Sequence, residues 1–185
     1  MQFSFLLQII MLNLAEKFLE MKDVEFVPFL LTEKADIFSI RLNGNEKTET
    51  EDFLIEFKDT QSSPLRNDLN SVLTTINSIG KEGALESFFR PEGLFADRIC
   101  AIPLLLSRRK SSDKCGSLRL YCIRMSDSLL ILGGGGEKKT RTYEEDPILS
   151  EKVKTLQSID KALTDMEDNG IDIASTIYNV TLKIQ

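Results

Sequence analysis

The chain has 185 residues, of which 42% are hydrophobic and 28% charged, and its formal net charge is −6. This composition excludes a disordered chain, and the length suits a single folded domain. No apolar run reaches the roughly 18 residues that a membrane-spanning helix needs. The three cysteines form no CxxC pair and histidine is absent, so we expect no zinc site and no cofactor. The odd number of cysteines favours a location in the reducing cytoplasm.

The first 20 residues contain an apolar run but lack the basic start and the small-residue cleavage site of a signal peptide. Two interpretations stay open. The range 1–20 is either an amphipathic helix of the protein or an over-extended reading frame whose true start is Met21. We place the range 21–185 in one α+β domain.

The range 21–58 is predicted to be β structure. The runs DVEFVPFLL, ADIFSIRL and EDFLIEF mix aromatic and β-branched residues, and NGN supplies turn residues between the last two. From Asn67 onward, apolar residues recur at helical spacing as far as Ile79, and Gly80 is a suitable stop. This pattern predicts a helix, and a short second helix is expected over 84–89.

Three antiparallel strands are predicted next, over 97–106, 118–125 and 129–132. Pro103 lies late in the first of these runs, which indicates an edge strand or a bulge. A polar loop separates the first two strands, and a short turn separates the last two.

A long helix is predicted over 147–168. Asp146 can cap it, Pro147 takes its first position, and apolar residues then step by three and four along one face. The range 171–185 can add a last strand. The expected fold is therefore an antiparallel sheet with a preceding helical pair and a C-terminal helix packed on it.

Positive charge is concentrated in one part of this acidic chain. The range 98–143 carries ten basic and three acidic residues, whereas the remainder carries 13 basic and 26 acidic residues. Such an island is typical of a site for an anionic partner, and a merely solvated surface is the alternative. The ten basic residues are Arg98, Arg108, Arg109, Lys110, Lys114, Arg119, Arg124, Lys138, Lys139 and Arg141.

Four glycines, Gly133 to Gly136, precede two of these lysines in the segment GGGGEKKT. A nucleotide-binding phosphate loop would need a glycine where Lys138 stands, and a helix directly after it. The sequence RTYEEDP follows instead. We therefore expect the glycines to allow a bulge or a sharp bend after a strand.

The strand LRLYCIRM is predicted to have one apolar face, with Arg119 and Tyr121 on the other face. It lies beside the strand that leads to Lys138, Lys139 and Arg141. We therefore predict that Arg119 and these three cations lie together on one exposed surface.

The segment LRLYCIRMSDSLLILGGGGEKKTRTY, residues 118–143, is similar to a pattern of the RelE/ParE-type bacterial toxins, particularly their HigB-like, phage-derived branch. That pattern is a basic-aromatic strand, a hairpin turn, and an apolar strand that runs into a glycine and a Lys-Lys-Thr-like segment. The order of a strand, two short helices and three antiparallel strands also resembles this family. The resemblance implies a RelE-like core at 67–168, with the strands of 21–58 as an extension.

The resemblance further implies a ribosome-dependent mRNA endonuclease without metal or cofactor, cytoplasmic and bacterial, with a cognate antitoxin as partner. Cleavage of RNA by its own 2′-OH needs a base, cations at the phosphate and an acid for the leaving oxygen. We assign these catalytic roles to Lys138, Lys139, Arg141 and Tyr143, because clustered cations lower the pKa of a lysine. RNA and phosphate binding is assigned to Arg98, Arg119, Tyr121 and Arg124.

One alternative function stays open. The acidic remainder of the chain would repel a ribosome, which favours a non-catalytic, phage- or mobile-element-derived protein whose basic face binds nucleic acid or protein. In that case Arg119 is an ion-pair partner between strands, Tyr121 lies at the edge of the core, and the lysines only keep a loop soluble.

Overall fold

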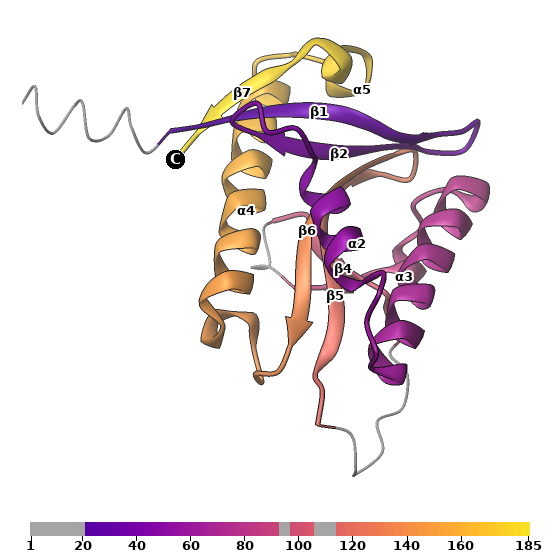
Figure 1. The fold of residues 1–185 in the computed structure, drawn as a ribbon. Helices are drawn as coiled ribbons and strands as arrows, with labels where there is room; N and C mark the ends of the chain where they lie inside the picture. Colours follow the sequence, from indigo (N-terminus) through magenta and orange to yellow (C-terminus); the bar gives the residue numbers. More distant parts are fainter. Residues whose placement is uncertain (1–20, 93–96, 106–113) are drawn as a thin grey trace, which may run out of the picture.

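The computed structural model describes residues 21–92, 97–105 and 114–185, so the range 1–20 and its two interpretations lie outside the described residues. The described strands form one mixed sheet in the order β3-β4-β5-β6-β2-β1-β7, with helices on both faces (Figure 1). The strands are β1 (Lys22–Leu31), β2 (Asp36–Leu42), β3 (Arg90–Pro91), β4 (Ile99–Ile102), β5 (Ser117–Ser126), β6 (Leu129–Lys138) and β7 (Thr181–Ile184).

The three strands predicted within the basic range are neighbours, and they are antiparallel as expected. β4 ends before Pro103, because proline has no N–H group to continue the ladder. The expectation of a wholly antiparallel sheet is wrong at one junction, where β2 lies parallel to β6. The parallel pairing arises because the chain crosses over through α2 (Glu49–Phe57) and α3 (Ser63–Glu82) before it returns to the sheet.

The run EDFLIEF, expected as a strand, is part of helix α2. The cause is a capping box. The Thr48 hydroxyl accepts a hydrogen bond from the Glu51 N–H at 3.3 Å, and the Glu51 carboxylate accepts one from the Thr48 N–H at 2.7 Å. Phe53 and Phe57 then lie one helical turn apart, and their ring centroids are 5.3 Å from each other. The capping signal therefore outweighs the β propensity of this run.

Helix α3 begins at Ser63 rather than at Asn67 and passes through Gly80 to Glu82. Its stop is Gly83, whose φ of 98° is in the left-handed region that favours glycine. The helix expected over 84–89 is only a 3₁₀ turn, η1 (Glu86–Phe88).

The long C-terminal helix, α4 (Pro147–Asp168), has the predicted bounds. The Asp146 carboxylate caps it by accepting hydrogen bonds from the N–H groups of Ile148 and Leu149, at 3.0 and 3.1 Å. A 3₁₀ turn, η2 (Tyr143–Glu145), leads from β6 into this helix. After it, α5 (Ile173–Thr176) and η3 (Ile177–Asn179) lead to β7, the expected last strand, which pairs with β1.

The sheet separates two hydrophobic cores. One core contains α4, and the other contains α2 and α3 (Figure 1). Strand β5 contributes to both, because Tyr121 and Ile123 belong to the α4 core while Leu120 and Cys122 belong to the other. The predicted two-residue periodicity of β5 is therefore correct, but both of its faces are covered. Within the described part of the chain, no helix is long and apolar enough to cross a membrane.

Candidate functional site

The four glycines lie inside strand β6, so they do not form a phosphate-binding loop. A Cβ atom on Gly133 or Gly136 would come within 2.8 or 2.9 Å of a leucine side chain of α4, and one on Gly135 within 2.1 Å of the Arg119 carbonyl oxygen. The ladder between β5 and β6 shifts register next to these residues. The glycines thus allow α4 and β5 to approach the backbone of β6 closely.

Three of the residues selected from the sequence come together where β5 and η2 meet the N-terminal end of α4. Arg119 is 2% exposed, Tyr121 is fully buried and Tyr143 is 9% exposed. The two tyrosine rings pack edge to face, with their centroids 6.3 Å apart. Arg119 and Tyr121 share this face of β5 because they are two residues apart along the strand.

The polar atoms of this group are only partly paired. Nη1 of Arg119 donates to the carbonyl oxygen of Pro103 at 3.0 Å. Nε of Arg119 and the hydroxyl of Tyr121 have no hydrogen-bond partner within the ranges 21–92, 97–105 and 114–185. Burial raises the pKa of Tyr121 above its usual value, and the neighbouring Glu92 carboxylate acts in the same direction. Burial also lowers the pKa of Arg119. Tyr121 therefore keeps its proton at neutral pH.

Two further residues, Glu92 and Arg90, complete this site. Nε of Arg90 and Oε1 of Glu92 form an ion pair at 3.0 Å. The Glu92 side chain is 6% exposed, and that of Arg90 is 48% exposed. We call the five residues, Arg119, Tyr121, Tyr143, Glu92 and Arg90, the Arg119 cluster.

No pattern along the chain points to Glu92 and Arg90. Both lie before the basic range 98–143. Arg90 belongs to the two-residue strand β3 and Glu92 follows that strand, which is too short for a periodic pattern. Only the pairing of β3 with β4 brings them to the sheet edge near β5.

The predicted exposed surface of Arg119, Lys138, Lys139 and Arg141 is wrong for Arg119. Its side chain is buried because α4 and η2 cover the face of β5 that was expected to be exposed. Lys139 and Arg141 are exposed and Lys138 is half-buried, at and just after the end of β6. Lys139 forms an ion pair with Glu137 at 3.1 Å. The exposed cations and the buried arginine are thus distinct features.

Arg98 and Arg124, both expected to bind phosphate, are engaged with protein groups. Arg98 pairs with Asp160 of α4 at 2.7 Å and with Glu167 at 2.8 Å. Nε of Arg124 donates to the Ala84 carbonyl at 2.6 Å, and its guanidinium pairs with Asp127. These contacts fasten the start of β4 and the β5–β6 turn to neighbouring elements. We therefore assign both arginines a structural role instead of phosphate binding.

The Arg119 cluster combines two guanidinium groups, two protonated phenols and one carboxylate, and all of these side chains except that of Arg90 are largely buried. Such a set can hold a phosphate, accept a proton and donate one. Among the described residues, no group of three or more Cys, Asp or Glu side chains is arranged to hold a metal ion.

Comparisons with protein-family models, with curated proteins and with solved structures found no match to this chain.

Proposed function

We propose that the chain is a metal-independent endoribonuclease whose reacting groups are those of the Arg119 cluster. The observation that supports this most is a pair of buried polar atoms, Nε of Arg119 and the hydroxyl of Tyr121, which find no hydrogen-bond partner among the described residues. The charge of Glu92 acts on both side chains. Buried polar atoms are nearly always paired, and an unpaired one calls for a specific explanation. A phosphate oxygen would satisfy both of these donors.

The chemistry follows from the protonation states. Glu92 accepts the proton of the 2′-OH, the 2′-oxygen attacks phosphorus, and the bond from phosphorus to the 5′-oxygen breaks. Tyr121 supplies the proton to the leaving oxygen, because a phenol carries its proton at neutral pH. Arg119 stabilises the charge on the phosphate oxygens during the transfer. Tyr143 packs against Tyr121 and holds its ring in place.

The exposed cations have a different role in this proposal. Lys138 is the last residue of β6, Lys139 and Arg141 follow it, and all three precede Tyr143 by a few residues. They bind the RNA backbone on either side of the reacting phosphate, which adds affinity without sequence preference.

The biological setting of the proposal rests on the resemblance to RelE/ParE-type toxins. It includes mRNA on a translating ribosome as the substrate and a cognate antitoxin with acidic side chains that covers the exposed cations. The three consecutive antiparallel strands β4, β5 and β6 are the part of the fold that supports this setting.

A second candidate is a binding protein without catalysis. It is favoured by the low exposure of Arg119 and Tyr121, because a phosphodiester reaches them only after covering groups move aside. In this case the exposed cations bind the partner and the Arg119 cluster only stabilises the fold.

The two candidates are separated by Glu92→Gln, which keeps the size of the side chain but removes the base. During induced expression, we expect this variant to lose growth arrest and the new 5′ ends of cellular mRNA. The matched control is Glu86→Gln, because the Glu86 side chain is 89% exposed and is not part of the cluster. If both variants arrest growth and cut transcripts as the wild type does, the catalytic role of the cluster is refuted.

A further inference from the structure

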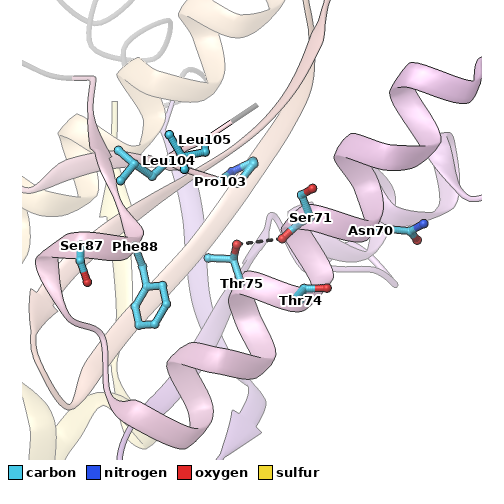
Figure 2. Close-up of a pocket in the computed structure, with 9 residues that line it drawn as sticks. All are labelled: Asn70, Ser71, Thr74, Thr75, Ser87, Phe88, Pro103, Leu104 and Leu105. Atoms are coloured by element: carbon cyan, nitrogen blue, oxygen red, sulfur yellow. Dashed lines mark hydrogen bonds between the residues drawn. The ribbon is translucent and has the colours of Figure 1, made fainter. Parts of the chain in front are cut away.

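A pocket of about 380 Å³ lies between helix α3 and the corner where η1 and the end of β4 meet (Figure 2). Phe88 lies on one side of it, with Leu104 and Leu105 beside it, and Ser71 and Thr75 of α3 lie opposite. The pocket is thus apolar along one wall and carries hydroxyl groups along the other.

The pocket does not suit an ion. None of the described residues that line it is charged. An anion would need a cationic or N–H donor set, and a cation would need carboxylates, so the preferred ligand is neutral. The aromatic ring of Phe88 is partly exposed and offers a stacking surface beside Leu104, which is 39% exposed, and Leu105, which is 80% exposed.

The hydroxyl groups on α3 are arranged as acceptors. Thr75 donates its proton to the Ser71 carbonyl at 2.8 Å, and Ser71 donates its own to the Asn67 carbonyl at 2.9 Å. Both hydroxyl oxygens therefore keep lone pairs for N–H groups of a ligand. Asn70, which also lines the pocket, has a side-chain amide without a hydrogen bond in the described part of the chain.

We propose that this pocket binds one nucleobase of a single-stranded RNA. A nucleobase is flat, neutral and edged with N–H groups and acceptors, so it can stack on Phe88 and pair with Ser71, Thr75 and Asn70. This inference rests on the proposed RNA-binding function and adds a base-reading site to it. The carbonyl of Pro103, a pocket residue, accepts the Arg119 hydrogen bond, so the pocket and the Arg119 cluster share one peptide group.

The test is a titration of the full chain with each of the four free ribonucleosides and with short single-stranded oligoribonucleotides. Binding is monitored through changes of the amide chemical shifts in nuclear magnetic resonance spectra. We expect shifts around the pocket with the oligonucleotides and weaker ones with a preferred nucleoside. Stacking on an aromatic side chain contributes about 1–3 kcal/mol per base, so Phe88→Leu should weaken binding by at least about fivefold. Equal affinity for a nucleoside and for an oligonucleotide would indicate a site for free nucleosides alone and would contradict the proposal.

Asn70→Ala provides a second variant at an exposed position, where loss of the fold is not expected. Its control is Asn77→Ala, two turns further along α3 and outside the pocket. The inference is overturned if neither nucleosides nor oligonucleotides shift pocket resonances, or if Phe88→Leu and Asn70→Ala bind as tightly as Asn77→Ala. Glu92→Gln should stop cleavage and still bind the nucleobase. Base binding by this variant therefore tests the pocket independently of the proposed catalysis.

Discussion

The substitution Gly135→Ala tests the position of the glycine run inside β6. The added Cβ would lie 2.1 Å from the carbonyl oxygen of Arg119 and 2.9 Å from the Cα of Leu120. Both atoms belong to the backbone of β5, so the clash is relieved only if the two strands separate. Overpacking of a well-packed interior costs about 1–3 kcal/mol, and we expect a loss at the upper end of that range. For a chain of this size the melting temperature should fall by about 6–12 °C.

The matched control is Gly133→Ala, because its Cβ would meet the side chain of Leu156 at 2.8 Å, and a side chain can move. Denaturant unfolding of both variants gives the two free energies. A smaller loss for Gly133→Ala than for Gly135→Ala is the expected order. If Gly135→Ala is as stable as the wild type, the close approach of β5 and β6 is refuted.

Two further predictions concern the exposed cations and the cap of α2. The double variant Lys138→Ala, Arg141→Ala should keep the melting temperature of the wild type and bind single-stranded RNA more weakly. The slope of the logarithm of the RNA-binding constant against the logarithm of the salt concentration should become smaller by about 1.4, because two phosphate contacts are lost. An unchanged slope would contradict this role of the two cations. Thr48→Ala should cost about 1 kcal/mol of unfolding free energy, because the capping box is lost. The backbone N–H and the hydroxyl of Thr48 both donate to the Glu51 carboxylate and lower its pKa, and the variant removes only the hydroxyl. The stabilisation that comes from the hydroxyl is present above the unfolded pKa of Glu51 and is lost as the pH falls through its folded pKa. The variant should therefore differ least from the wild type in acid, and a difference that does not shrink there would contradict this cause.

Much of the fold follows from patterns along the chain. Helix α4 has a proline at its first position, an aspartate cap and a regular apolar face, and these local signals agree with one another. The strands β4, β5 and β6 are separated by polar turns and were predicted as neighbours. Helix α2 was missed because its aromatic residues favour a strand, whereas the capping box of Thr48 and Glu51 favours a helix.

The candidate site was only partly predictable. The sequence shows which residues share a face of β5, but it does not show which helix covers that face. Arg119 was therefore expected on an exposed surface, although α4 covers the face of β5 that it shares with Tyr121. Glu92 joins them only through tertiary structure, since it is far from Arg119 along the chain. The partners of Arg98 likewise lie on α4, more than 60 residues away.

The most direct test of the proposed function is Tyr121→Phe, measured for stability and for mRNA cleavage in the same preparation. The hydroxyl of Tyr121 is buried and has no hydrogen-bond partner in the described part of the chain, so its removal should leave the melting temperature unchanged or raise it. Loss of the proton donor should lower cleavage by about 10²–10⁴-fold and abolish growth arrest on induction. A variant that folds as the wild type does and still cleaves mRNA at the wild-type rate would contradict the account.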